Sequence, residues 1–222
     1  MLILHDHPAV PTDRATTATI EDLANALSDA GAEVSYHNET LPDLMASARV
    51  YTELLTSIFG AQMPIEAYKR VQEAAASLPD NVTSFEAVRL KGTVLTHRDW
   101  IRADRLRAQL FARWVALFKH IDAVICPVSS TPAFPRDHSE DQKKRLIIVD
   151  GAAHPFLDQI HWSGVATLAG LPSTAVPAGL SAEGLPIGVQ IIGPFLEDRT
   201  PLALAQLIER DFRGFVPPKG LH

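Results

Sequence analysis

Apolar residues along the chain alternate between short strand-like runs and longer helical stretches. Residues 2–4 form a buried-strand pattern, and apolar positions then recur at helical spacing over residues 20–30, where Gly31 ends the repeat. Strand character resumes at residues 33–36. This order predicts a β-α-β unit with a parallel strand pair. Its strand-to-helix turn contains no glycine, which argues against a dinucleotide phosphate loop.

The middle of the chain is predicted to be helical. Three segments with helical spacing cover residues 42–58, 65–76 and 85–90. A fourth helix begins after Thr96, because Thr96 and Asp99 fit a capping box, and it is expected to end near residues 119–120.

Strands and turns return in the last hundred residues. The expected elements are a buried strand at 122–126 ended by Pro127, a long loop at 127–155 with a hairpin turn at Asp150-Gly151, a helix at 156–169 ended by Gly170, strands at 174–176 and 189–192, and a last helix from Pro201. We therefore expect one α/β domain over residues 1–222, with a mixed β-sheet and helices on both faces.

Composition excludes several classes of protein. The 222 residues are 46% hydrophobic and carry a net charge of -6, which argues against nucleic-acid binding. No stretch approaches the ~20 apolar residues of a membrane span, and the N-terminus lacks a basic signal-peptide region, so we expect no membrane association and a cytoplasmic location. The single cysteine, Cys126, lies in an apolar run and is expected to be buried.

Two Gly-Leu-Pro tripeptides carry the most specific signal. Gly170-Leu171-Pro172 ends a predicted helix, and Gly184-Leu185-Pro186 precedes a strand that contains Val189-Gln190. Glycine permits positive φ and proline cannot extend a helix, so each tripeptide ends one element and directs the next. This stretch strongly resembles the C-terminal signature of the amidase-signature family of amide hydrolases. Residues 122–135 resemble the family's upstream strand and loop. The resemblance to the C-terminal half of an amidase covers essentially the whole chain, strongly after Ile121 and loosely before it.

The resemblance implies Ser–cis-Ser–Lys chemistry that this sequence does not carry. In the family, an upstream lysine and a Gly-Gly-Ser-Ser-Gly-Gly loop supply the base, the bridging serine, the nucleophile and the oxyanion donors. No Gly-Gly dipeptide occurs in this chain, and Met1 is expected to lie just past the catalytic half. No catalytic residue is therefore assigned, and no cofactor or metal is predicted.

Four residues are candidates for the wall of a substrate funnel. By their position in the resemblance they are Trp162, Val165, Thr131 and Phe134. Packing of Trp162 in the core is an equally weighted interpretation, because tryptophan is often buried.

Three hypotheses follow. The first is a truncated amidase that is inactive alone. Its intact form would hydrolyse a small-molecule amide, and the truncated chain would pair with an N-terminal amidase half or with itself. The second is a non-catalytic small-molecule binding or assembly module derived from an amidase. The third is an enzyme with an unrelated site in the 127–155 loop, built from Ser129, Ser130 and His154.

Overall fold

A four-stranded mixed sheet lies at the centre of the protein. The computed structural model describes residues 1–79 and 81–217. The strands of the sheet are β1 (Leu2–Ile3), β2 (Val124–Pro127), β5 (Ser173–Leu180) and β6 (Pro186–Ile192). Their order is β1-β2-β6-β5, with β1 parallel to β2 and the other neighbours antiparallel.

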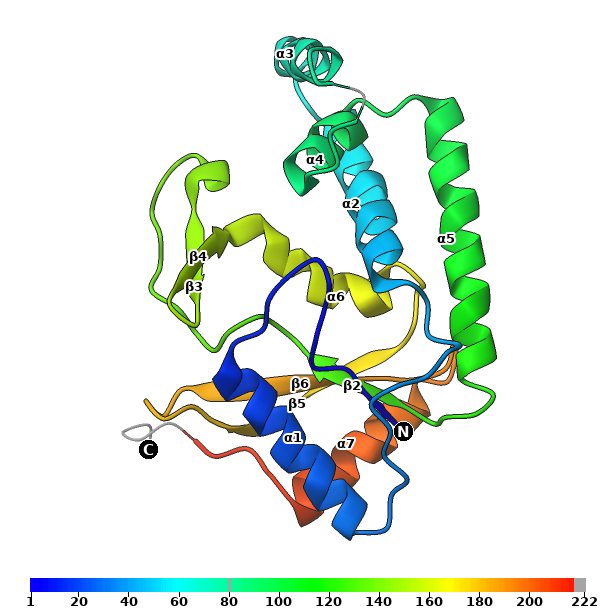
Figure 1. Ribbon diagram of the computed structural model, residues 1–222, viewed down its shortest axis with the longest axis vertical. Helices are drawn as coiled ribbons and strands as arrows, with labels where there is room; N and C mark the ends of the chain where they lie inside the picture. Colours follow the sequence, from blue (N-terminus) through cyan, green and yellow to red (C-terminus); the bar gives the residue numbers. More distant parts are fainter. Residues whose placement is uncertain (80, 218–222) are drawn as a thin grey trace.

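Helices cover both faces of this sheet, which confirms the predicted α/β fold (Figure 1). On one face lie α1 (Arg14–Asp29) and α7 (Arg199–Asp211), and on the other lies α6 (Ile160–Thr167). Successive strand residues point to opposite faces, so β2 sends Ile125 toward the α1 and α7 side while Val124 and Cys126 point toward α6. The sheet therefore separates two hydrophobic cores.

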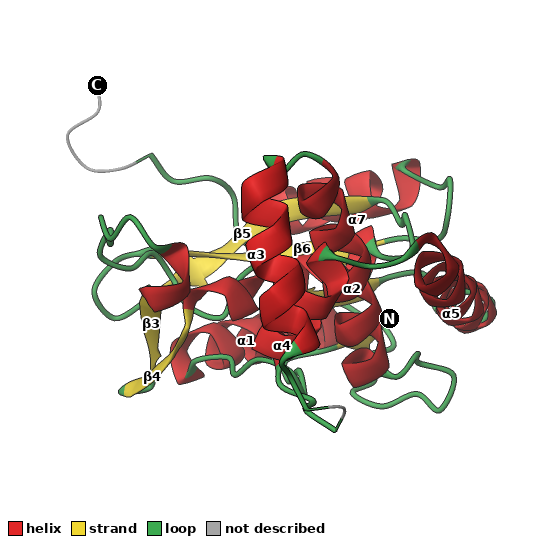
Figure 2. Ribbon diagram, turned by 90° about the horizontal axis from the view of Figure 1, so that it is seen from above, coloured by secondary structure: helices red, strands yellow, loops and turns green. Residues whose placement is uncertain are grey.

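A group of four helices is inserted between α1 and β2. They are α2 (Leu44–Ala61), α3 (Ile65–Ala76), α4 (Phe85–Thr93) and α5 (His97–Leu117). Figure 2 shows α5 along one side of this group, away from the hairpin strands β3 and β4. The capping box is confirmed, because the Thr96 hydroxyl accepts a hydrogen bond from the Asp99 amide and donates one to its carboxylate. None of the helices in the described ranges is long and apolar enough to cross a membrane.

A separate hairpin occupies the long loop at 127–155. Its strands are β3 (Leu146–Val149) and β4 (Ala152–Pro155), preceded by a 3-10 turn η1 (Gln142–Lys144). Asp150 and Gly151 have φ values of 48° and 83°. Positive φ at both central residues is the geometry for which Asp-Gly is favoured, so the predicted turn is confirmed. The Asp150 carboxylate reaches the first turn of α1, where it accepts a hydrogen bond of 3.2 Å from the Arg14 amide.

The strand predicted at residues 33–36 does not form, although the predicted parallel pairing with residues 2–4 is present at one residue. Only Ser35 pairs with β1, in an isolated parallel bridge to Leu2. The segment has little to bury, since Glu33 is exposed and Tyr36 is 48% exposed. The ladder cannot extend further, because β1 itself is two residues long.

Three other boundaries differ from the predictions. Pro127 belongs to β2 instead of ending it, and it pairs with Val189 at the strand terminus, where a missing N–H is tolerated. β5 and β6 are longer than the strands predicted at 174–176 and 189–192, with an irregularity in pairing between Pro177 and Gly179. The helix predicted over 156–169 opens as a 3-10 turn, η2 (Phe156–Gln159), before α6 begins.

Candidate functional site

A cleft lies at the carboxyl end of β2, beside the middle of β5 and next to the start of α1. It has a volume of about 520 Å³ and is formed by residues 128–134 after β2, by β5, and by the first residues of β6. Thr131 and Phe134, two of the predicted wall residues, line it. We call this the sheet-edge cleft.

The 128–134 segment is fixed by two hydrogen bonds near its start. Asp13, which caps α1, donates its amide to the Ser130 carbonyl at 2.9 Å. The Ser129 hydroxyl donates to the side-chain oxygen of Gln159 at 2.9 Å. The segment is therefore held between the start of α1 and the turn that precedes α6, which positions Thr131 and Phe134 at the cleft.

Groups that could perform acid–base chemistry do not line the cleft. Its polar side chains are the hydroxyls of Thr16, Ser129 and Thr131, and the remaining described lining residues are apolar or glycine. Cys126 lies nearby but is fully buried, and burial raises the pKa of its thiol far above the usual range, so it stays protonated and unreactive. The described residues that line the cleft therefore provide no nucleophile–base pair.

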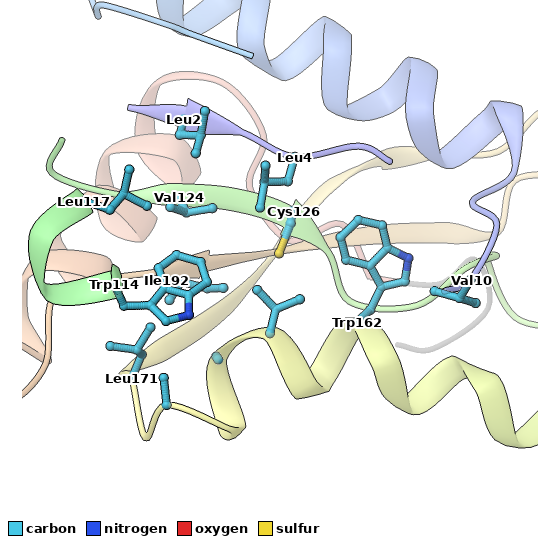
Figure 3. Close-up of a cluster of buried hydrophobic side chains, with 13 residues drawn as sticks. Leu2, Leu4, Val10, Trp114, Leu117, Val124, Cys126, Trp162, Leu171 and Ile192 are labelled. Carbon is cyan, nitrogen blue, oxygen red and sulfur yellow. The ribbon is translucent and has the colours of Figure 1, made fainter. Parts of the chain in front are cut away.

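The other two predicted wall residues do not line the cleft and lie in the hydrophobic core. Trp162 is fully buried, and Figure 3 shows it in the same hydrophobic cluster as Cys126 and Val10. Its indole N–H donates to the Thr12 hydroxyl at 3.1 Å. Val165, one turn later on α6, is also buried in this cluster. Both residues therefore pack in the core of this chain.

Two buried histidines lie beside Trp162. The rings of His7 and His161 stack with centroids 6.0 Å apart, and His161 also contacts the Phe85 ring at 4.2 Å. Both nitrogens of His161 are buried without a hydrogen-bond partner. Desolvation lowers the pKa of each histidine to about 4, so both are neutral near pH 7. Within the described residues, no group of three or more candidate ligands could hold a metal here.

A polar pair that sequence reasoning missed lies next to His161. Arg89 on α4 forms an ion pair of 2.9 Å with Asp158 in η2, and the two side chains are 19% and 17% exposed. The residues are 69 positions apart, and neither belongs to a recognisable motif. Only the packing of α4 against the segment before α6 brings them together, so the sequence carried no signal for this pair.

Exposed apolar side chains surround the sheet-edge cleft. A second concavity shares residues 131–134 with it and extends to the β3–β4 hairpin. Along the two concavities lie five large apolar residues that are 37–59% exposed, and we call them the apolar belt: Val128, Phe134, Leu146, Ile148 and Leu185.

Comparison with known proteins places this architecture in a family. The family model for amidases matches residues 3–202. The chain belongs to the amidase family. This amidase chain is 32% identical over 117 residues to a glutamyl-tRNA(Gln) amidotransferase subunit from Hyphomonas neptunium, covering 53% of the chain and 22% of the relative.

Solved structures share the fold of this amidase chain. A bacterial aryl acylamidase of the amidase-signature family aligns with a TM-score of 0.67 and 19% identity, covering 98% of the chain and 46% of the relative. A glutamyl-tRNA(Gln) amidotransferase subunit from Thermotoga maritima aligns with a TM-score of 0.68 and 19% identity, covering 98% and 44%. The amidase chain thus spans about a fifth of its curated relatives and less than half of these structures.

Proposed function

We propose that this chain supplies the substrate-facing wall of an amide hydrolase and does not hydrolyse amides by itself. The observation that carries the proposal is the sheet-edge cleft, a concavity of about 520 Å³ whose described lining side chains are hydroxyl-bearing or apolar. Amide hydrolysis requires an activated nucleophile and donors for the oxyanion. The amidase family provides these through a serine–serine–lysine set, and the sequence contains no matching glycine-rich loop.

In this proposal, Thr131 and Phe134 contact the substrate. The Phe134 ring is 39% exposed beside the cleft and offers an apolar surface, while Thr131 offers a hydroxyl. Trp162 and Val165 act indirectly, because they hold α6 against the sheet under this wall.

The partner in this proposal is a polypeptide segment that carries the catalytic half of an amidase. The apolar belt is the surface that such a segment would cover, since exposed apolar patches mark interaction sites. The substrate is a small-molecule amide, as in the amidase family.

Ammonia release from aliphatic and aromatic amides tests the proposal. The purified 222-residue chain is expected to release none above background, and an added catalytic half from a related amidase should restore turnover. In the restored enzyme, Phe134→Ala should raise KM, whereas Leu202→Ala on the far helix α7 should leave it unchanged. Robust release by the chain alone, abolished by a serine-directed inhibitor, would show that a nucleophile is present and the proposal is wrong.

A non-catalytic binding module is the second candidate. The observation that favours it is that the sheet-edge cleft is held in place by contacts within the chain, through Asp13 and Gln159. This candidate requires that a small amide binds at the cleft with micromolar affinity without a partner. Calorimetry that detects no binding at millimolar ligand would remove its support.

A further inference from the structure

A cavity separate from the sheet-edge cleft and from its neighbouring concavity lies on the opposite side of α6 from the sheet. It has a volume of about 420 Å³, within the range of small-molecule sites, and lies between α3, α4 and the segment at 155–158. Its walls are mainly apolar and include Met63, Val71, Phe85, Leu90 and Leu157. We call it the α3–α4 cavity.

Arg89 and Asp158 both line this cavity, and each has hydrogen-bonding atoms that the ion pair between them does not use. The pair joins one guanidinium nitrogen to one carboxylate oxygen at 2.9 Å. A guanidinium carries five N–H groups and a carboxylate has two acceptor oxygens. The remaining donors of Arg89 and the second oxygen of Asp158 make no hydrogen bond to the described residues. Partly buried polar groups usually have hydrogen-bond partners, and a ligand that carries both a carbonyl oxygen and an N–H group matches the acceptor and donors of this pair.

The charges around the cavity favour an uncharged ligand. Arg89 and Asp158 cancel each other. Exposed Glu86 is at the margin, and Arg49 lies over the Phe85 ring at 5.4 Å. His161, 4.0 Å from Asp158, is a buried ring that is neutral near pH 7. An anionic ligand would compete with Asp158 for Arg89. A cationic ligand would compete with Arg89 for Asp158. Either ligand would leave one partly buried charge of the pair without its partner.

We propose that the α3–α4 cavity binds a small neutral carboxamide or urea with a flat apolar body. Its carbonyl oxygen accepts a hydrogen bond from Arg89 and its N–H donates to the free oxygen of Asp158, while the apolar body lies among Phe85, Leu90 and Val71. All of these residues belong to this chain. Binding therefore needs no catalytic half and does not depend on the function proposed above.

Nuclear magnetic resonance titration of the isotope-labelled chain tests the proposal with three ligands of matched size. Benzamide should bind saturably with a dissociation constant of ~1 mM or lower, and should shift resonances of α4 and residues 155–158. Benzoate and benzylammonium, which carry a charge in place of the amide, should bind at least about tenfold more weakly.

Variants identify the cavity that is occupied. Val71→Trp fills the α3–α4 cavity and should abolish benzamide binding, while Gln72→Trp, at the exposed neighbouring position on α3, should leave it unchanged. Ala175→Trp, which obstructs the sheet-edge cleft, should also leave it unchanged. Arg89→Met should weaken benzamide at least about tenfold, and near-ultraviolet circular dichroism checks its fold.

Three results would overturn the proposal: no saturable benzamide binding, benzamide binding that survives Val71→Trp, or benzoate binding as tight as benzamide. The ammonia-release assay addresses the proposed function separately, so the failure of one proposal is distinguishable from the failure of the other.

Discussion

Gln190 joins three elements through one buried side chain. Its amide nitrogen donates to the backbone carbonyls of Pro127 in β2 and Trp162 in α6, both at 2.9 Å. Its amide oxygen accepts from the Ser173 hydroxyl in β5 at 3.2 Å. The glutamine that follows the second Gly-Leu-Pro tripeptide thus has a structural role, since it satisfies two buried carbonyls and holds α6 on the sheet.

Replacing Gln190 with methionine should destabilise the chain by about 3 kcal/mol, because two buried carbonyls would lose their donor. Ser173→Ala, which removes only the contact to the amide oxygen, should cost about 1 kcal/mol. Chemical denaturation of both variants measures the difference. Equal losses for the two would show that the carbonyls find other donors.

His7 and His161 make the stability of the chain depend on pH. Their folded pKa values are about 4, below the value of 6.5 expected when unfolded. Between these values the unfolded chain binds more protons, so stability is retained above pH 6.5 and falls as the pH drops toward 4. The loss should approach about 3 kcal/mol for each histidine.

His161→Phe should reduce this pH dependence, because the ring contact with Phe85 is kept while the titrating group is removed. His120→Gln, at an exposed position, is the control and should leave the profile unchanged. Unfolding free energies measured from pH 7 to pH 4 give the comparison. If the unfolding free energy of His161→Phe falls with pH as steeply as that of the wild type, the acid sensitivity comes from other groups.

At the scale of elements, α3 is the least anchored helix. None of its residues is buried, and Pro64 at its start provides no side-chain cap. Only one side of this 12-residue helix is partly buried, through Ala67, Tyr68, Val71 and Ala75, and helices this short are marginal in water. Its side chains nevertheless form one wall of the α3–α4 cavity through Val71.

Amide hydrogen exchange should therefore be much faster in α3 than in α1, which buries Ile20, Leu23 and Leu27. Saturating benzamide should slow exchange in α3 if the cavity is occupied. Equal protection of α3 and α1 in the free chain would contradict the expectation.

The sequence predicted elements well where local chemistry decides them. The bounds of α3 at residues 65–76, the cap at Thr96 and the turn at Asp150-Gly151 were all found correctly. The strand at 33–36 was wrong because strand pairing depends on the length of a distant partner. Distance along the chain also decided which site residues could be predicted. Thr131 and Phe134 belong to one short segment. Arg89 and Asp158 could not be paired from the sequence, because only tertiary packing brings them together.

For the whole molecule, the apolar belt has consequences for association. Phe134, Ile148 and Leu185 are among its exposed members, and they come from separate segments that converge at one surface. Surfaces of this kind promote self-association when no partner covers them.

The purified chain should therefore bind a hydrophobic dye and form oligomers. Ile148→Glu should shift it toward the monomer, whereas Leu202→Glu, similarly exposed on α7 at 56% against 59%, should not. Size-exclusion chromatography with light scattering measures this. A monomeric wild-type chain with little dye binding would show that the belt is not an interaction surface.

The pairing of β1 with β2 determines when the sheet can assemble during synthesis. Leu2 pairs with Val124, so β1 leaves the ribosome without this neighbour until the strand at 124–127 has also emerged. At ~10 residues per second this interval lasts about 10 s, and during it only the intervening helices have local contacts to form. β6 then enters between β2 and β5, so the sheet is completed only after residues 186–192 have been made.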